Sequence, residues 1–178
     1  MSFKFGLFKV LTSISLFLTG FFCIGLFYSY IATRQFFALL WLLLTGAALI
    51  HTWLSLRLQR NLSDPSFPLG ENTPGGIRIM GGFSLLYAFL FLCFGGILVL
   101  MGYAMPLDTM KEGIKASMDQ LKASGFDSVE SLRSFCRGFG PFILFYGLTV
   151  LVNVILSISF LQALKYRQSQ QPQDDQSY

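Results

Sequence analysis

The chain has 178 residues, of which 53% are apolar and only 12% are charged, and its mean hydropathy is +0.59. A water-soluble domain carries about 25% charged residues, so this composition excludes an ordinary soluble domain. The formal net charge of +4 does not call for nucleic acid as a partner, because basic residues beside a bilayer attract anionic lipid headgroups.

Four stretches contain no charged side chain, and each is long enough to cross a bilayer, which needs about 20 apolar residues. These stretches are residues 10–33, 35–56, 79–107 and 138–164. We therefore predict an all-α integral membrane protein whose four transmembrane helices form a bundle. The predicted helices are residues 8–33, 35–57, 79–105 and 138–165, and residues 1–167 form a single membrane domain.

The first predicted span follows Lys4 and Lys9, as a secretory signal would follow its basic residues. Its apolar run is longer than a signal core and lacks small residues at a cleavage site, so we expect this span to be retained. Within it, Thr12, Ser15 and Thr19 are three and four residues apart and share one face of the helix.

The second predicted span contains His51, the only histidine of the chain. It precedes the end of the charge-free stretch at Leu56 by about 7 Å of helical rise, next to Trp53. We expect the imidazole at the membrane interface, bonded to a headgroup, to water or to Ser55. The sequence places neither a second histidine nor a carboxylate near it, so a metal or haem site is not predicted.

The connection over residues 57–78 is rich in proline, glycine, asparagine and aspartate, which predicts an irregular loop. The third predicted span then carries small residues among large ones, which lets a neighbouring backbone come close. These small residues are Gly81, Ser84, Ala88, Gly95 and Gly102.

The connection between the third and fourth spans predicts an amphipathic helical hairpin, with helices over residues 108–124 and 128–137. Apolar residues recur at helical spacing on one face: Leu107, Met110, Ile114, Met118 and Leu121. Thr109 with Glu112, and Asp127 with Glu130, fit capping boxes. The apolar face can cover the end of the bundle, lie in the membrane interface, or dock a partner protein.

The fourth predicted span carries Thr149, Asn153 and Ser157 at intervals of four residues, which places them on one face. The Asn153 amide needs partners that hydrocarbon cannot supply, so it faces another helix or a wet cavity. Two roles follow, a contact between helices or a pathway for a substrate or ion. The polar segment of residues 168–178 is predicted to be disordered.

Basic residues favour a cytoplasmic location for both termini, although the bias is small. Seven lie on the side of the termini and six on the other side: Lys4, Lys9, Arg57, Arg60, Arg78, Lys165 and Arg167, against Arg34, Lys111, Lys115, Lys122, Arg133 and Arg137. The seven flank helix ends, whereas three of the six lie in a segment where acidic residues match them.

The charge-free spans contain no intramembrane acid, and the three cysteines show no closely spaced redox pair. We therefore predict no catalytic, cofactor-binding or metal-binding residues and no cofactor. The leading hypothesis is a non-catalytic accessory, scaffold or assembly subunit of a membrane complex, whose partner is another membrane protein or a second copy. The alternatives are a passive channel or carrier for a small neutral solute along the polar stripes, and a lipid-binding membrane protein.

Overall fold

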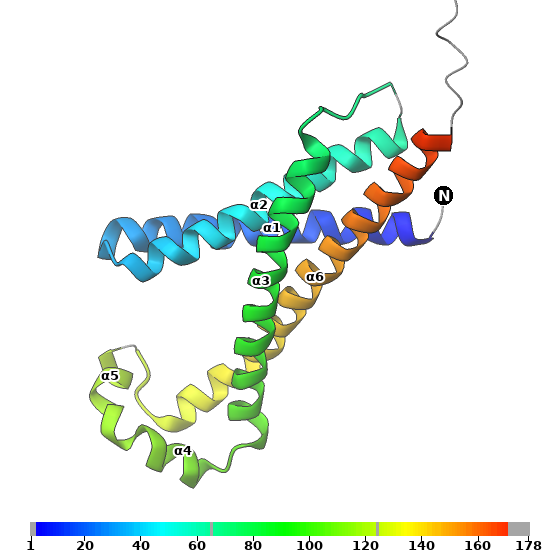
Figure 1. Ribbon diagram of the computed structural model, residues 1–178. Helices are drawn as coiled ribbons and strands as arrows, with labels where there is room; N and C mark the ends of the chain where they lie inside the picture. Colours follow the sequence, from blue (N-terminus) through cyan, green and yellow to red (C-terminus); the bar gives the residue numbers. More distant parts are fainter. Residues whose placement is uncertain (1–2, 65, 124, 171–178) are drawn as a thin grey trace, which may run out of the picture. The chain divides into compact units, whose positions relative to one another are not determined.

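A computed structural model describes residues 3–64, 66–123 and 125–170, and over these residues the chain is helical without strands (Figure 1). Four helices are long: α1 (Phe3–Thr33), α2 (Phe36–Ser63), α3 (Thr73–Val99) and α6 (Val129–Gln170). A π-helical turn, η1 (Leu100–Ala104), continues α3. Short elements follow it: α4 (Leu107–Ile114), the 3-10 turn η2 (Lys115–Ser117) and α5 (Met118–Ala123).

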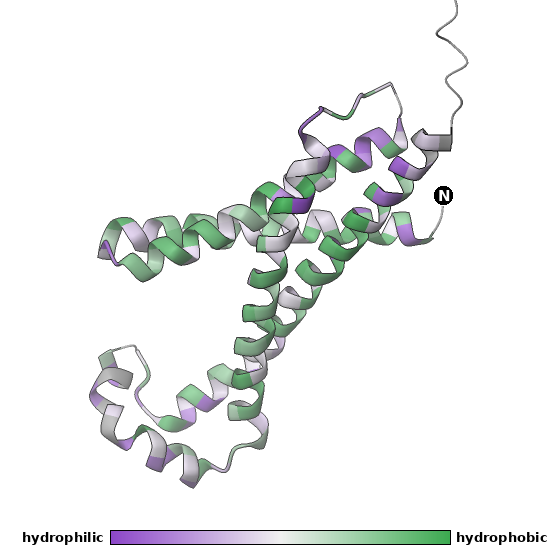
Figure 2. Cartoon of the chain, in the orientation of Figure 1, coloured by the Kyte–Doolittle hydropathy of each residue, from purple (hydrophilic) through white to green (hydrophobic). Residues whose placement is uncertain are grey.

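The long helices are apolar enough to cross a membrane, as predicted. Four candidate spans are present: Phe3–Thr33, Phe36–Ser63, Thr73–Ala104 and Val129–Tyr166. Hydrophobic residues dominate these helices, as the green ribbon of Figure 2 shows. Many of their large apolar side chains are exposed, and Phe17 and Phe21 are more than two thirds exposed. Patches of this kind are rare on monomers in water, so the outer surface of these helices fits lipid as its solvent.

The chain divides into two compact units. Unit 1 comprises Met1–Tyr87 and Thr149–Tyr178, and unit 2 comprises Ala88–Leu148, so α3 and α6 contribute to both. In unit 1 the helices share an apolar core at the end where the chain begins, formed by Phe5, Phe8, Leu58, Ile77 and Leu161. The start of α1, the ends of α2 and α6, and the start of α3 therefore lie at one end of unit 1.

Unit 2 depends on close contact between the backbones of α3 and α6. A Cβ at Gly95 would lie 2.8 Å from the Leu144 nitrogen, and one at Gly140 would lie 3.0 Å from the Val99 nitrogen. Gly102 and Gly147 meet the opposite helix in the same way. The contacts pair 92 with 147, 95 with 144, 99 with 140 and 102 with 137, which is one constant antiparallel register. The close approach predicted for the third span is thus present at Gly95 and Gly102.

The helix predicted over residues 128–137 is not a separate element, because α6 runs unbroken from Val129 to Gln170 through Pro141. Proline has no N–H, so the carbonyl of Arg137 loses its intrahelical partner. The Tyr103 hydroxyl donates to this carbonyl at 3.1 Å and replaces the missing bond. The capping box at the start of α6 is formed by Ser128 and Ser131, one residue later than the predicted pair of Asp127 and Glu130. The hydroxyl oxygen of each serine accepts a hydrogen bond from the backbone N–H of the other.

The π-helical turn at the end of α3 leaves backbone carbonyls without intrahelical partners. The Gly102 carbonyl accepts hydrogen bonds from Nε of Arg133, at 3.1 Å, and from Nε of Arg137, at 2.8 Å. Two guanidinium groups at a helix C-terminus also interact favourably with the helix dipole. Arg133 and Arg137 therefore act as a cap on α3 from the neighbouring helix.

The loop between α2 and α3 is shorter than predicted. Helix α2 extends to Ser63 and α3 begins at Thr73, so the irregular connection is residues 64–72, with Pro65 outside the described residues. Pro74 is compatible with the helix because N–H groups of a first turn have no intrahelical partner. Gly76 lies where a Cβ would come within 2.9 Å of Leu54 Cδ1, so it allows α2 and α3 to approach.

The first helix of the predicted hairpin is divided into α4, η2 and α5, where Gly113 and Ser117 supply weak helix formers. Helix α4 begins at Leu107, so Thr109 is inside it and does not cap it. The chain turns at Gly125, whose φ of +86° favours glycine. Of the tail predicted to be disordered, residues 168–170 continue α6 and residues 171–178 lie outside the described residues.

The glycine contacts of unit 2 predict a position-specific loss of stability. Gly95→Ala should lower the free energy of unfolding by about 1–3 kcal/mol, because the added carbon meets the Leu144 backbone, which cannot move aside easily. Unfolding in mild detergent measures this loss. Gly96→Ala is the control, since a Cβ there has open space and gains up to about 1 kcal/mol of helix propensity. Equal behaviour of the two variants would contradict the contact.

The bond between Tyr103 and the Arg137 carbonyl predicts a coupling with Pro141. Tyr103→Phe should lower stability by about 1 kcal/mol, the net contribution of one hydrogen bond. In a Pro141→Ala background the alanine N–H can bond the carbonyl itself, so the same change should cost almost nothing. A double-mutant cycle of unfolding free energies measures the coupling, and additive effects would rule out the replacement of one bond by the other.

Candidate functional site

A cluster of buried polar side chains lies inside unit 1, between α1, α2 and α6. Its members are separated by three or four residues along each helix, so each helix turns one polar stripe inward. The stripes consist of Thr12, Ser15 and Thr19 on α1, His51, Ser55 and Gln59 on α2, and Thr149, Asn153 and Ser157 on α6, and we refer to them together as the cluster. Contacts between helices join Thr12 with Gln59 and Asn153, and His51 with Ser157. None of these side chains is more than 5% exposed.

Three helices meet at the Thr12 hydroxyl. Nε2 of Gln59 donates to Thr12 Oγ1 at 2.6 Å and to the Phe8 carbonyl at 3.0 Å. Thr12 Oγ1 lies 2.6 Å from Oδ1 of Asn153 and 2.7 Å from the Phe8 carbonyl. A hydroxyl has one proton to donate. Because the Gln59 amide already donates to the Phe8 carbonyl, we assign the Thr12 proton to the bond with Asn153 Oδ1. Hydrogen bonds then connect α2 through α1 to α6.

His51 makes the second contact between helices. Its Nε2 lies 3.1 Å from Ser157 Oγ on α6 and 3.5 Å from Ser55 Oγ. The Ser157 hydroxyl also lies 2.9 Å from the Val154 carbonyl, and the tautomer of the ring decides which of His51 and Ser157 is the donor. Gly81 on α3 makes room for the ring, because a Cβ there would lie 3.3 Å from His51 Cε1.

The His51 side chain is 1% exposed and therefore buried among the helices, and its Nε2 lies 3.5 Å from Oγ of Ser55, one of its expected partners. Its depth at the membrane interface stays a prediction. Helix α2 continues to Ser63, seven residues beyond the end of the charge-free stretch at Leu56. His51, Ser55 and Gln59 then recur every four residues on the inward face. Gln59 was not among the predicted site residues, although this spacing is visible in the sequence.

Other buried hydroxyls bond within their own helix. Thr45, Thr52 and Ser84 each donate to the carbonyl four residues earlier. Two buried atoms of the cluster, Ser15 Oγ and Asn153 Nδ2, have no hydrogen-bond partner among the residues that the structure describes. The cluster can therefore join helices through some of its atoms. It leaves one hydroxyl, of Ser15, and one amide N–H donor, of Asn153, that could bond water or a small polar molecule.

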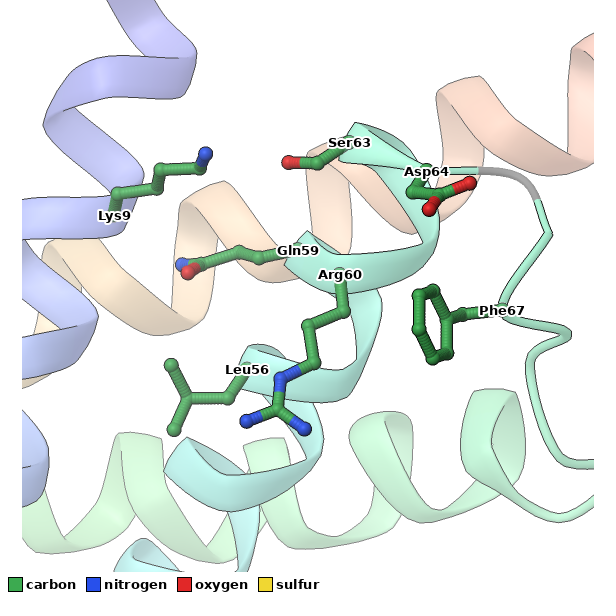
Figure 3. A pocket seen from close by; sticks show the side chains of 7 residues that line it. All are labelled: Lys9, Leu56, Gln59, Arg60, Ser63, Asp64 and Phe67. Carbon is green, nitrogen blue, oxygen red and sulfur yellow. The ribbon is translucent and has the colours of Figure 1, made fainter.

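A hollow of about 320 Å³ opens at the end of unit 1, between α1, α2 and the loop that follows α2. In Figure 3, Lys9 extends from α1 toward the α2 side chains, and Phe67 of the loop stands beside Arg60. The other residues that line the hollow are Leu56, Gln59, Ser63 and Asp64. This hollow brings two cations and polar groups to the end of a candidate span.

The predicted docking face lies in unit 2. Met110 is 1% exposed and therefore already covered within the chain, whereas Leu107 and Ile114 are half-buried. The side chains of Met118 and Leu121 lie outside the described part of the chain. Lys111 of α4 pairs with Glu130 of α6 at 2.9 Å, which ties α4 to the start of α6.

Over the part of the chain that the structure describes, no three His, Cys, Asp or Glu side chains are grouped so that they could hold a metal ion. Comparison with protein-family models, curated proteins and solved structures gives no match to the chain. The polar cluster and the hollow beside it are therefore interpreted from their own chemistry.

The contact at Thr12 predicts a loss of stability when its hydroxyl is removed. Thr12→Val keeps the side-chain shape but leaves Gln59 and Asn153 without a shared partner, and should cost about 1–2 kcal/mol. Unfolding in mild detergent provides the measurement. Ser13→Ala is the control, because the exposed Ser13 hydroxyl bonds only the Lys9 carbonyl of its own helix. A Thr12→Val variant as stable as this control would contradict the contact.

Proposed function

We propose that the protein is a non-catalytic, multi-pass membrane protein that serves as a scaffold or assembly subunit of a membrane complex. The observation that carries this proposal is the bonding of the buried polar cluster. Gln59, Thr12 and Asn153 use their polar groups to hold α1, α2 and α6 together, and His51 does the same with Ser157. Side chains committed in this way support a rigid frame more readily than chemistry on a substrate.

The proposed contact surface is the outer side of α4 and the turn that follows it. Burial of Met110 and the ion pair of Lys111 with Glu130 hold α4 against its own unit. Glu112 and Lys115 are exposed on the other side, and Leu107 and Ile114 border them. Charged side chains on the outer surface of α4 can recognise a partner of complementary charge. Because α4 is already fixed against unit 2, binding does not require an additional loss of conformational entropy in this segment.

A swap of charges on this surface tests the proposal. The wild-type protein, purified by affinity in mild detergent, should bring down a stoichiometric partner. Glu112→Lys combined with Lys115→Glu should reduce its yield at least about ten-fold, because like charges across an interface are costly. Net charge is unchanged, and Met110 is left intact because its burial makes it part of the fold.

The control swap is Glu71→Lys with Arg78→Glu, two exposed residues of unit 1 that also leave net charge unchanged. It should retain the partner. Purification of the wild-type protein alone, or equal retention by both swaps, would argue against the scaffold.

A passive channel or carrier for a small neutral solute is the second candidate. Ser15 Oγ and Asn153 Nδ2 favour it, since buried polar atoms without a partner among the described residues are suited to water or a small solute. The scaffold is preferred because the other polar atoms of Asn153 and His51 already bond neighbouring helices.

A further inference from the structure

Two neighbouring hollows at the end of unit 1 share Arg60 and Phe67. The first, of about 320 Å³, adds Lys9, and the second, of about 200 Å³, adds Arg57 and residues of the loop. Three cations therefore surround this corner, from α1 and from two successive turns of α2. Guanidinium groups present several N–H donors in a planar fork that matches the oxygens of a phosphate.

Within the described part of the chain, no ion pair joins these three cations to an acidic side chain. The ion pair there joins Lys111 to Glu130, and Lys9 contacts the ring of Phe5 at 4.7 Å. Asp64 lines the first hollow, but its carboxylate accepts from the Ser66 N–H at 3.0 Å. Hydrogen bonds from the hydroxyl and the N–H of Ser66 hold the pKa of Asp64 below its usual value, so it remains an anion. The corner keeps a surplus of positive charge.

An apolar groove of about 380 Å³ lies farther along α2. Leu43, Gly46 and Ile50 of α2 form one wall, and Met80 and Phe83 of α3 form the other. Leu43, Ile50 and Arg57 are seven residues apart, so they lie on nearly the same face of the helix. Arg57 follows Ile50 by about 10 Å of rise, and the half-exposed Trp53 lies between them. One face of α2 thus leads from an apolar groove to a basic corner.

We propose that this face binds one anionic phospholipid, with its phosphate at Lys9, Arg57 and Arg60 and an acyl chain in the groove between α2 and α3. The membrane supplies such a ligand at the right depth, since the groove lies within a candidate span and the cations lie at its end. Free phosphate would occupy only the basic corner, whereas a phospholipid would occupy both the corner and the groove. This inference does not depend on the scaffold function.

Trp53 provides a local probe. The chain has two tryptophans, so Trp41→Phe leaves Trp53 as the only one. This protein is placed in phosphatidylcholine vesicles that contain a minor fraction of phosphatidylglycerol with brominated acyl chains, which quench tryptophan on contact. The quenching should show that phosphatidylglycerol is enriched around Trp53 at least about five-fold, compared with brominated phosphatidylcholine at the same fraction. Five-fold is the effect of a single basic residue beside an anionic lipid.

The headgroup contact is tested by charge. Arg57→Gln and Arg60→Gln should each lower the enrichment about five-fold. Arg78→Gln is the matched control: it removes the same charge from an exposed residue at the same end of unit 1, but Arg78 lines neither hollow. All three side chains are exposed, so the fold is expected to survive each change, and circular dichroism verifies this.

The acyl-chain contact is tested by filling the groove. Gly46→Leu should fold, because a Cβ at Gly46 meets no atom within 4 Å, and should reduce the enrichment. The control is Gly25→Leu on α1: a Cβ there also meets no atom within 4 Å, and this change should leave the enrichment unchanged. Inorganic phosphate at constant ionic strength separates the two sources of phosphate: it should not displace the lipid.

Three results would overturn the lipid site: equal quenching by both brominated lipids, equal loss in Arg78→Gln and Arg60→Gln, or displacement by inorganic phosphate with no effect of Gly46→Leu. The first two would mean general attraction to an anionic surface, and the third would mean a site for phosphate alone.

Discussion

A polar side chain among hydrocarbon groups must find its hydrogen-bond partner inside the protein, and the packing of unit 1 depends on this constraint. Thr12 is the point at which it acts most directly, because its hydroxyl joins Gln59 of α2 to Asn153 of α6. In a bilayer, apolar side chains would gain little by leaving lipid for another helix, so they would not set this arrangement alone. The hydrogen bonds decide which faces of the helices meet.

Backbone contacts perform the corresponding task in unit 2. Gly95, Gly102, Gly140 and Gly147 remove the side chains that would keep α3 and α6 apart. The same closeness brings Tyr103 to the carbonyl that Pro141 leaves without a partner, and brings Arg133 and Arg137 to the end of η1. A proline in mid-helix is therefore tolerated because the neighbouring helix supplies the missing donor.

The proposed scaffold and lipid site use different parts of this frame. The buried cluster gives rigidity and α4 gives an outward charged surface in unit 2. The basic corner and apolar groove of unit 1 would hold a lipid whose headgroup charge matches Lys9, Arg57 and Arg60. An accessory protein with these features would join a protein partner and an anionic lipid without any reactive group of its own.

The sequence by itself determined the helical class, the four apolar spans, the stripes of Thr12, Ser15, Thr19 and of Thr149, Asn153, Ser157, and the small residues of α3. These follow from local composition and from the helical period, which nearby residues set. It did not determine where α2 ends, that α6 continues through Pro141, or that His51 and Gln59 belong to the buried cluster. Only the tertiary structure decided the last two points, because each depends on an atom from a distant part of the chain: Tyr103 for Pro141, Ser157 for His51, and Thr12 for Gln59.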